Sequence, residues 1–145
     1  MTDRSDQRDS SYPLPTFGEW LVSEAQPNPV REKSFDFALV VLELYQVLQE
    51  EREYVISKQL MRSGTSIGAN VEEAVAAESR RDFLHKMNLA LKEARETHYW
   101  LRLLSASELV PGIDVTTCLD GADELVRLLT AITRSTSKPD PTKDQ

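Results

Sequence analysis

The sequence predicts an all-α protein, an up-down-up-down antiparallel four-helix bundle with a partly ordered N-terminal arm. Apolar residues recur at helical spacing in every segment between positions 34 and 134, and no segment alternates as a strand does. Of the seven prolines, only Pro111 lies between those positions. A chain of 145 residues suits one domain with one apolar core.

The prolines also set the predicted domain limits, because proline lacks the N–H donor that a helix interior needs. We expect an arm over residues 1–33, part of it disordered, the bundle over 34–134 and a disordered tail over 135–145. The arm is too apolar for a freely solvated segment, and Phe17 and Trp20 are its candidate interface residues. The arm docks on its own bundle or on a neighbouring subunit.

The first helix is expected to begin at Ser34, a residue type that favours the N-cap position. Its apolar residues follow helical spacing at Phe37, Val41, Leu44 and Leu48. The polar segment that follows contains Glu50, Glu51 and Glu53, which we interpret as a solvated turn. Periodicity alone does not say whether the chain turns there.

The second helix is expected from about Glu53 to Ala76, with an apolar face that is interrupted by small residues at Gly64 and Gly68. Each glycine inside a helix costs about 1 kcal/mol relative to alanine, so close packing must compensate for the loss. The apolar face comprises Ile56, Leu60, Ile67, Val71 and Ala74.

The third helix is the most regular segment, and Ser79 is its predicted N-cap. Its apolar residues alternate steps of four and three, which is the 3.5-residue seam of antiparallel bundles. Since the small residues Ala90 and Ala94 lie midway along it, we expect this helix to approach the glycines of the second helix closely. The seam comprises Phe83, Met87, Ala90, Ala94, Thr97, Leu101 and Leu104.

The fourth helix follows the break at Pro111 and Gly112, and Asp114 is its predicted cap. Its inward face is expected to comprise Cys118, Ala122, Leu125, Leu129 and Ile132.

Composition excludes several classes of protein. The net charge of −7 argues against indiscriminate nucleic-acid binding, although a local basic surface stays compatible with it. No apolar run approaches the ~20 residues of a membrane span, and no secretory signal is visible, so we expect a cytoplasmic protein without membrane contact. The single cysteine, Cys118, excludes an intramolecular disulfide and is interpreted as a small buried residue.

A basic stripe runs along the third helix, opposite its apolar seam. It can grip a phosphate backbone and stack one base on Tyr99. The alternative is a solvated face balanced by acidic neighbours, with an ion pair between Lys92 and Glu96. Tyr99 and Trp100 are also candidate interface residues, because aromatic side chains are enriched at interfaces. The stripe comprises Arg81, His85, Asn88, Lys92, Arg95, Tyr99 and Arg102.

No catalytic or metal-binding pattern is visible, and we expect a protein that is not an enzyme and needs no cofactor or metal. A bundle di-metal site uses a pair of Glu-x-x-His motifs, which the sequence lacks. His85 and His98 lie about 140° apart around a helix and cannot form one ligand pair.

The segment from Gln59 to Glu73 resembles the motif of the bacterial four helix bundle proteins, a family first met as products of intervening sequences in large-subunit ribosomal RNA genes. This chain departs from the family pattern at Met61, where a basic residue usually stands beside Arg62. It also departs at Ser63 and Gly64, where alanines usually stand, and at Ala74, where glycine is usual. Of the segment's motif and structural residues, Asn70 and Glu73 occupy the most characteristic positions, and the others are Gln59, Arg62, Gly64 and Gly68. The other matching residues are Phe37, Ala38, Tyr45, Leu60, Ser66, Ile67, Phe83, Leu84, Ala90, Ala94 and Glu96.

The resemblance implies a turn between the first two helices and a homo-oligomeric ring, often a pentamer. It also implies a role with RNA or a ribonucleoprotein, because relatives serve as accessory proteins to reverse transcriptases in diversity-generating retroelements. For Asn70 and Glu73 two roles stay open: hydrogen bonds between helices, or contact with a ligand. We therefore expect a self-associating protein that binds RNA or a ribonucleoprotein, or alternatively a protein-protein adaptor without nucleic-acid binding.

Overall fold

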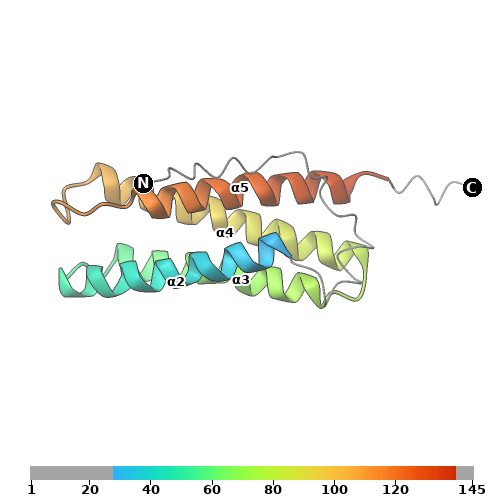
Figure 1. Cartoon of the computed structure of the whole chain (residues 1–145), viewed down its shortest axis with the longest axis horizontal. Coiled ribbons are helices and arrows are strands. Elements are labelled where there is room, and N and C mark those ends of the chain that lie inside the picture. Colours follow the sequence, from blue (N-terminus) through green and yellow to red (C-terminus); the bar gives the residue numbers. More distant parts are fainter. Residues whose placement is uncertain (1–27, 140–145) are drawn as a thin grey trace, which may run out of the picture.

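Four helices make up the described part of the chain, residues 28–139 of a computed structural model. Figure 1 shows them side by side along one axis. The connection between the first and second helices and the connection between the third and fourth lie at the same end of the bundle. Each helix packs mainly on two neighbours, so the first and third are diagonal partners. The predicted up-down-up-down bundle is confirmed. The helices are α2 (Pro29–Glu50), α3 (Ile56–Val75), α4 (Arg80–Ala106) and α5 (Thr116–Ser137).

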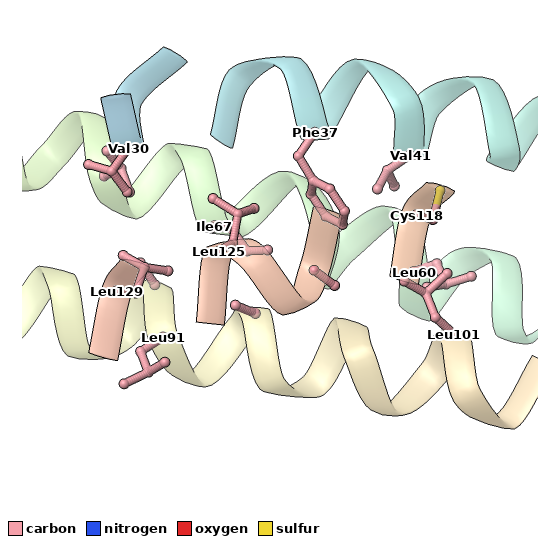
Figure 2. Close-up of a cluster of buried hydrophobic side chains, with 14 of the residues drawn as sticks. Val30, Phe37, Val41, Leu60, Ile67, Leu91, Leu101, Cys118, Leu125 and Leu129 are labelled. Atoms are coloured by element: carbon pink, nitrogen blue, oxygen red, sulfur yellow. The ribbon is translucent and has the colours of Figure 1, made fainter. Parts of the chain in front are cut away.

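The core lies where the four apolar faces meet. Figure 2 shows Phe37, Leu60, Leu101 and Leu125, which come from four different helices, pointing into one interior. The whole seam of α4 is buried, as its 3.5-residue pattern predicts. The inward faces predicted for the other helices are buried as well.

The start of α2 differs from the prediction. Asn28 is the N-cap, and its Oδ1 accepts a hydrogen bond from the Arg31 N–H at 3.2 Å. Pro29 takes the first helical position, where the missing N–H costs nothing. Ser34 lies inside the helix, buried, and donates to the Arg31 carbonyl, so its prediction as a cap was wrong. The helix therefore begins ahead of the expected boundary at residue 34.

The turn between α2 and α3 is organised by a buried carboxylate. Glu53 accepts hydrogen bonds from the N–H groups of Val55, Ile56 and Ser57 at 3.1, 2.9 and 2.7 Å. These donors would otherwise be unsatisfied at the start of α3. The interpretation of Glu53 as a solvated residue was wrong, because its buried carboxylate accepts these backbone hydrogen bonds and is not left in water. Arg52 makes the turn without glycine by adopting a φ of 60°.

Of the other two helix starts, that of α4 agrees with the sequence, whereas the N-cap of α5 is Val115 and the prediction of Asp114 was wrong by one residue. Ser79 caps α4 by accepting from the Asp82 N–H at 3.0 Å. Asp114 accepts from the Thr116 N–H at 2.9 Å, and hydrogen bonding to Thr116 lowers the pKa of this carboxyl. The guanidinium of Arg80 donates to the Thr136 carbonyl at the far end of α5, a helix that continues past the expected limit at residue 134.

The glycines of α3 make room for a different neighbour from the one expected. A Cβ at Gly64 would lie 2.8 Å from a Val41 methyl group, and a Cβ at Gly68 would lie 3.4 Å from the Ser34 carbonyl oxygen. Both neighbours belong to α2, so the glycines do not make room for the third helix, although α3 and α4 do pack closely, as expected. The buried Thr97 hydroxyl of α4 instead donates to Ser63 of α3, with 2.9 Å between the oxygens.

Candidate nucleic-acid interface

The basic stripe lies on the outward face of α4, where every one of its residues is exposed. Because its members recur in steps of four and three, they form one line along the helix, opposite the buried seam. The structure thus brings all the predicted residues of the stripe to one surface: Arg81, His85, Asn88, Lys92, Arg95, Tyr99 and Arg102.

Two carboxylates of α4, Glu93 and Glu96, turn away from this line, toward α3. Arg62 of α3 lies 3.3 Å from a Glu93 oxygen and makes a second, shorter contact with Glu96. The hydrogen bond from Arg62 is the main cause that lowers the pKa of Glu96. The predicted ion pair between Lys92 and Glu96 was wrong, because the guanidinium of Arg62 takes the carboxylate instead.

Further polar contacts join the two flanks of α4 to the neighbouring helices. Lys86 contacts Glu73 of α3 at 2.6 Å, and His98 contacts Asp123 of α5 at 2.9 Å. Within residues 28–139, the four cations of the stripe have no carboxylate partner. They therefore present an unneutralised positive surface. These cations are Arg81, Lys92, Arg95 and Arg102.

Tyr99 provides an aromatic ring on the stripe, and its residue is 49% exposed. The Trp100 ring meets it edge-on, with 5.1 Å between centroids and 65° between planes. Trp100 is half-buried against the core, and its indole N–H donates to Glu96 at 3.1 Å. The other two candidate interface residues, Phe17 and Trp20, lie outside the described residues.

The motif residues of α3 divide between its two neighbours. Arg62 and Glu73 pair with side chains of α4, whereas Gly64 and Gly68 face α2. The Asn70 amide donates to the Ser66 carbonyl of its own helix at 2.9 Å.

Glu73 therefore bridges two helices, as one of the two expected roles requires, and Asn70 does not. Gln59 is half-buried on the same helix, where its carbonyl accepts from the Ser63 hydroxyl at 2.9 Å.

Two further findings concern only residues 28–139. No group of three or more His, Cys, Asp or Glu side chains gathers there as a metal site would require. No helix in this range is long and apolar enough to cross a membrane. Cys118 is buried, as expected, and burial raises the pKa of its thiol.

The family model of the 23S rRNA-intervening sequence protein matches residues 26–131, which is most of the chain. The chain belongs to this family. A solved structure from Bacteroides thetaiotaomicron, a protein of unknown function from the S23 ribosomal protein family, is similar with a TM-score of 0.68 and 45% identity. The similarity covers 72% of this chain and 98% of that one. No curated protein matches the chain.

This member of the 23S rRNA-intervening sequence family also has an exposed apolar face that the sequence interpretation missed. Phe35, Leu39 and Leu42 of α2 are 61%, 46% and 37% exposed. Their spacing of four and three places them on one side of the helix, a signal that was readable but was hidden beside the stronger core pattern. Since α2 and α4 are diagonal partners, this apolar face points away from the basic stripe.

Proposed function

We propose that this protein binds RNA through the outward face of α4. The observation that carries the proposal is the separation of charges on that helix. Within residues 28–139 the four cations of the stripe point outward without a carboxylate partner, while Glu93 and Glu96 are held by Arg62 at the flank. Affinity for nucleic acid arises largely when Lys and Arg displace counterions from phosphates, so unpaired cations are the groups that contribute.

The size of the stripe suits a nucleic-acid segment. Arg81 and Arg102 are 21 positions apart, which corresponds to about 30 Å along a helix. The net charge of −7 does not oppose this use, because local charge decides contact at short range and salt screens distant charges beyond about 10 Å. The family's description as a 23S rRNA-intervening sequence protein supports RNA as the polyanion.

The test is RNA binding by fluorescence anisotropy over a series of salt concentrations. The triple variant Arg81→Gln, Lys92→Gln, Arg95→Gln removes three charges from the stripe. We expect its affinity to fall strongly, and the slope of log affinity against log salt to decrease by about 2 to 3, since each lost phosphate contact removes about 0.7 to 0.9.

The matched control removes three exposed cations from other helices, with the changes Lys58→Gln, Arg127→Gln and Arg134→Gln. It has the same net charge as the first variant. Equal loss in both variants would show that only overall charge matters, and unchanged binding in the stripe variant would overturn the proposal.

A second candidate function is self-association through α2. The exposed line of Phe35, Leu39 and Leu42 supports it, because monomeric proteins seldom expose large apolar side chains in register. The sequence resemblance implies a homo-oligomeric ring, often a pentamer. We therefore propose another copy of this chain as the partner that covers the exposed face of α2. Light scattering at micromolar concentration should return several times 16.4 kDa, and a monomeric mass would favour an adaptor that uses this face for another protein.

A further inference from the structure

We infer that the stripe takes unpaired RNA, with Tyr99 as a stacking platform for a base and Arg62 as the residue that positions this platform. The inference rests on the proposed function. Tyr99 lies on the cationic line between Arg95 and Arg102, which are four residues before it and three after it. These steps correspond to about 6 and 4.5 Å along the helix, so both cations lie close to any nucleotide on the ring.

The exposed ring distinguishes single strands from duplexes. In an RNA duplex the base faces are covered by their neighbours, and the deep, narrow major groove does not admit side chains. A duplex therefore meets this helix only through phosphates and sugars, and Tyr99 gains nothing from it. An unpaired base offers its π-face, and stacking on an aromatic side chain contributes about 1–3 kcal/mol per base.

A chain of contacts holds the ring in place. The Trp100 edge lies against Tyr99, and the Trp100 indole is fixed by its hydrogen bond to a Glu96 oxygen. The same oxygen accepts from Arg62 of α3. Arg62 therefore orients Tyr99 through two intermediate side chains, without contacting the ring. This positioning role explains why an arginine at position 62 matters even though Glu93 and Glu96 neutralise its charge.

The experiment compares three probes of equal phosphate content: an oligouridylate strand, the abasic strand of the same length, and a duplex. The readout is the ratio of uridylate affinity to abasic affinity, in which the contribution of phosphate contacts cancels. Tyr99→Ala should lower this ratio about 5- to 150-fold, which corresponds to the stacking of one base. Tyr99→Phe should preserve the ratio, because the ring remains.

Two further variants test the positioning role. Trp100→Leu removes the ring edge without changing charge, and Arg62→Met releases Glu96. Both should lower the ratio by less than Tyr99→Ala does, and neither should lower it further when Tyr99 is already alanine. Circular dichroism checks that each variant stays folded. An unchanged ratio in both variants would overturn the role of Arg62.

The outcomes separate the two proposals. If the wild-type protein binds none of the probes, the proposed function fails and the stacking inference fails with it. If it binds all three equally, and Tyr99→Ala leaves the ratio unchanged, RNA binding stands and the stacking inference is wrong. A ratio that falls with Tyr99→Ala, and by less with Trp100→Leu and Arg62→Met, supports the inference.

Discussion

The diagonal helices α2 and α4 present opposite chemistry to their surroundings. The outward side of α2 carries Phe35, Leu39 and Leu42, whereas the outward side of α4 carries Tyr99 and four cations that have no carboxylate partner in the described part of the chain. Because the helices lie on opposite sides of the bundle, a contact made by one leaves the other accessible. The proposed assembly and the proposed RNA binding therefore use separate surfaces.

The inner sides of the same two helices differ as well. Helix α2 approaches its neighbours at glycines: Val41 packs over Gly64, and Phe37 packs over Gly121. Helix α4 is joined to its neighbours by polar pairs, such as Arg62 with Glu96. These pairs place Glu93 and Glu96 at the flank of α4, away from the stripe. Ion pairs join α2 to its neighbours as well, Arg31 with Glu72 and Lys33 with Glu124, so the close approach at glycines is the feature that distinguishes α2.

The largest expected effect concerns the proposed assembly. Leu39→Lys places a charge in the middle of the apolar face of α2, where desolvating it in an interface would be costly. We expect the mass in light scattering to fall to that of the 16.4 kDa monomer, with RNA binding by each subunit retained.

The matched control for this change is Leu103→Lys. Leu103 is 38% exposed on α4, close to the 46% of Leu39, so the same charge enters a similarly exposed site on the opposite helix. The control should leave the mass unchanged. Loss of assembly in the control alone would place the interface on α4 and contradict the separation of the two faces.

The sequence predicts the core of the fold well, because burial repeats with the helix period. The seam of α4 from Phe83 to Leu104 is visible as regular apolar spacing, and its Ser79 cap has a local signature. The start of α2 was missed for the opposite reason. Asn28 and Pro29 form a common start signal, but the proline was interpreted as a boundary of the folded region.

Which helices contact each other is harder to predict than which side of each helix is buried. Gly64 and Gly68 reveal that some backbone comes close, but small size does not identify which neighbour approaches. The stripe was predicted from spacing within α4, while the partner of Glu96 lies 34 positions earlier in α3. Local i,i+4 rules favoured Lys92, since they contain no information about the adjacent helix.

The second prediction tests the close approach that fixes α2. Gly64→Val should destabilise the protein by about 3 kcal/mol, because even its Cβ would lie 2.8 Å from a methyl group of the stiff Val41 side chain. Urea unfolding monitored by circular dichroism measures the loss.

Gly68→Ala is the control for this prediction, since its added Cβ would be at 3.4 Å from the Ser34 carbonyl oxygen, an ordinary contact. It should be neutral or stabilise the helix by up to about 1 kcal/mol. A neutral Gly64→Val variant would show that α2 has room to move, and would remove shape as the feature that distinguishes α2 from α4.

The smallest expected effect concerns the ion pair between Arg62 and Glu96 at the flank of α4. The hydrogen bond from Arg62 lowers the pKa of Glu96, so this pair stabilises the fold above the ordinary carboxyl value of 4.5, and the contribution is lost as pH falls through the lowered pKa. Because the pair is partly exposed, Glu96→Gln should cost only about 0.5 kcal/mol at pH 7.

The difference in unfolding free energy between wild type and Glu96→Gln should therefore shrink toward zero in acid, while Gly64→Val should cost a similar amount at every pH at which the protein folds. Urea unfolding of the three proteins across an acid series measures both trends. A Glu96→Gln difference that persists after the carboxyl is protonated would mean that packing, and not charge, holds this flank of α4.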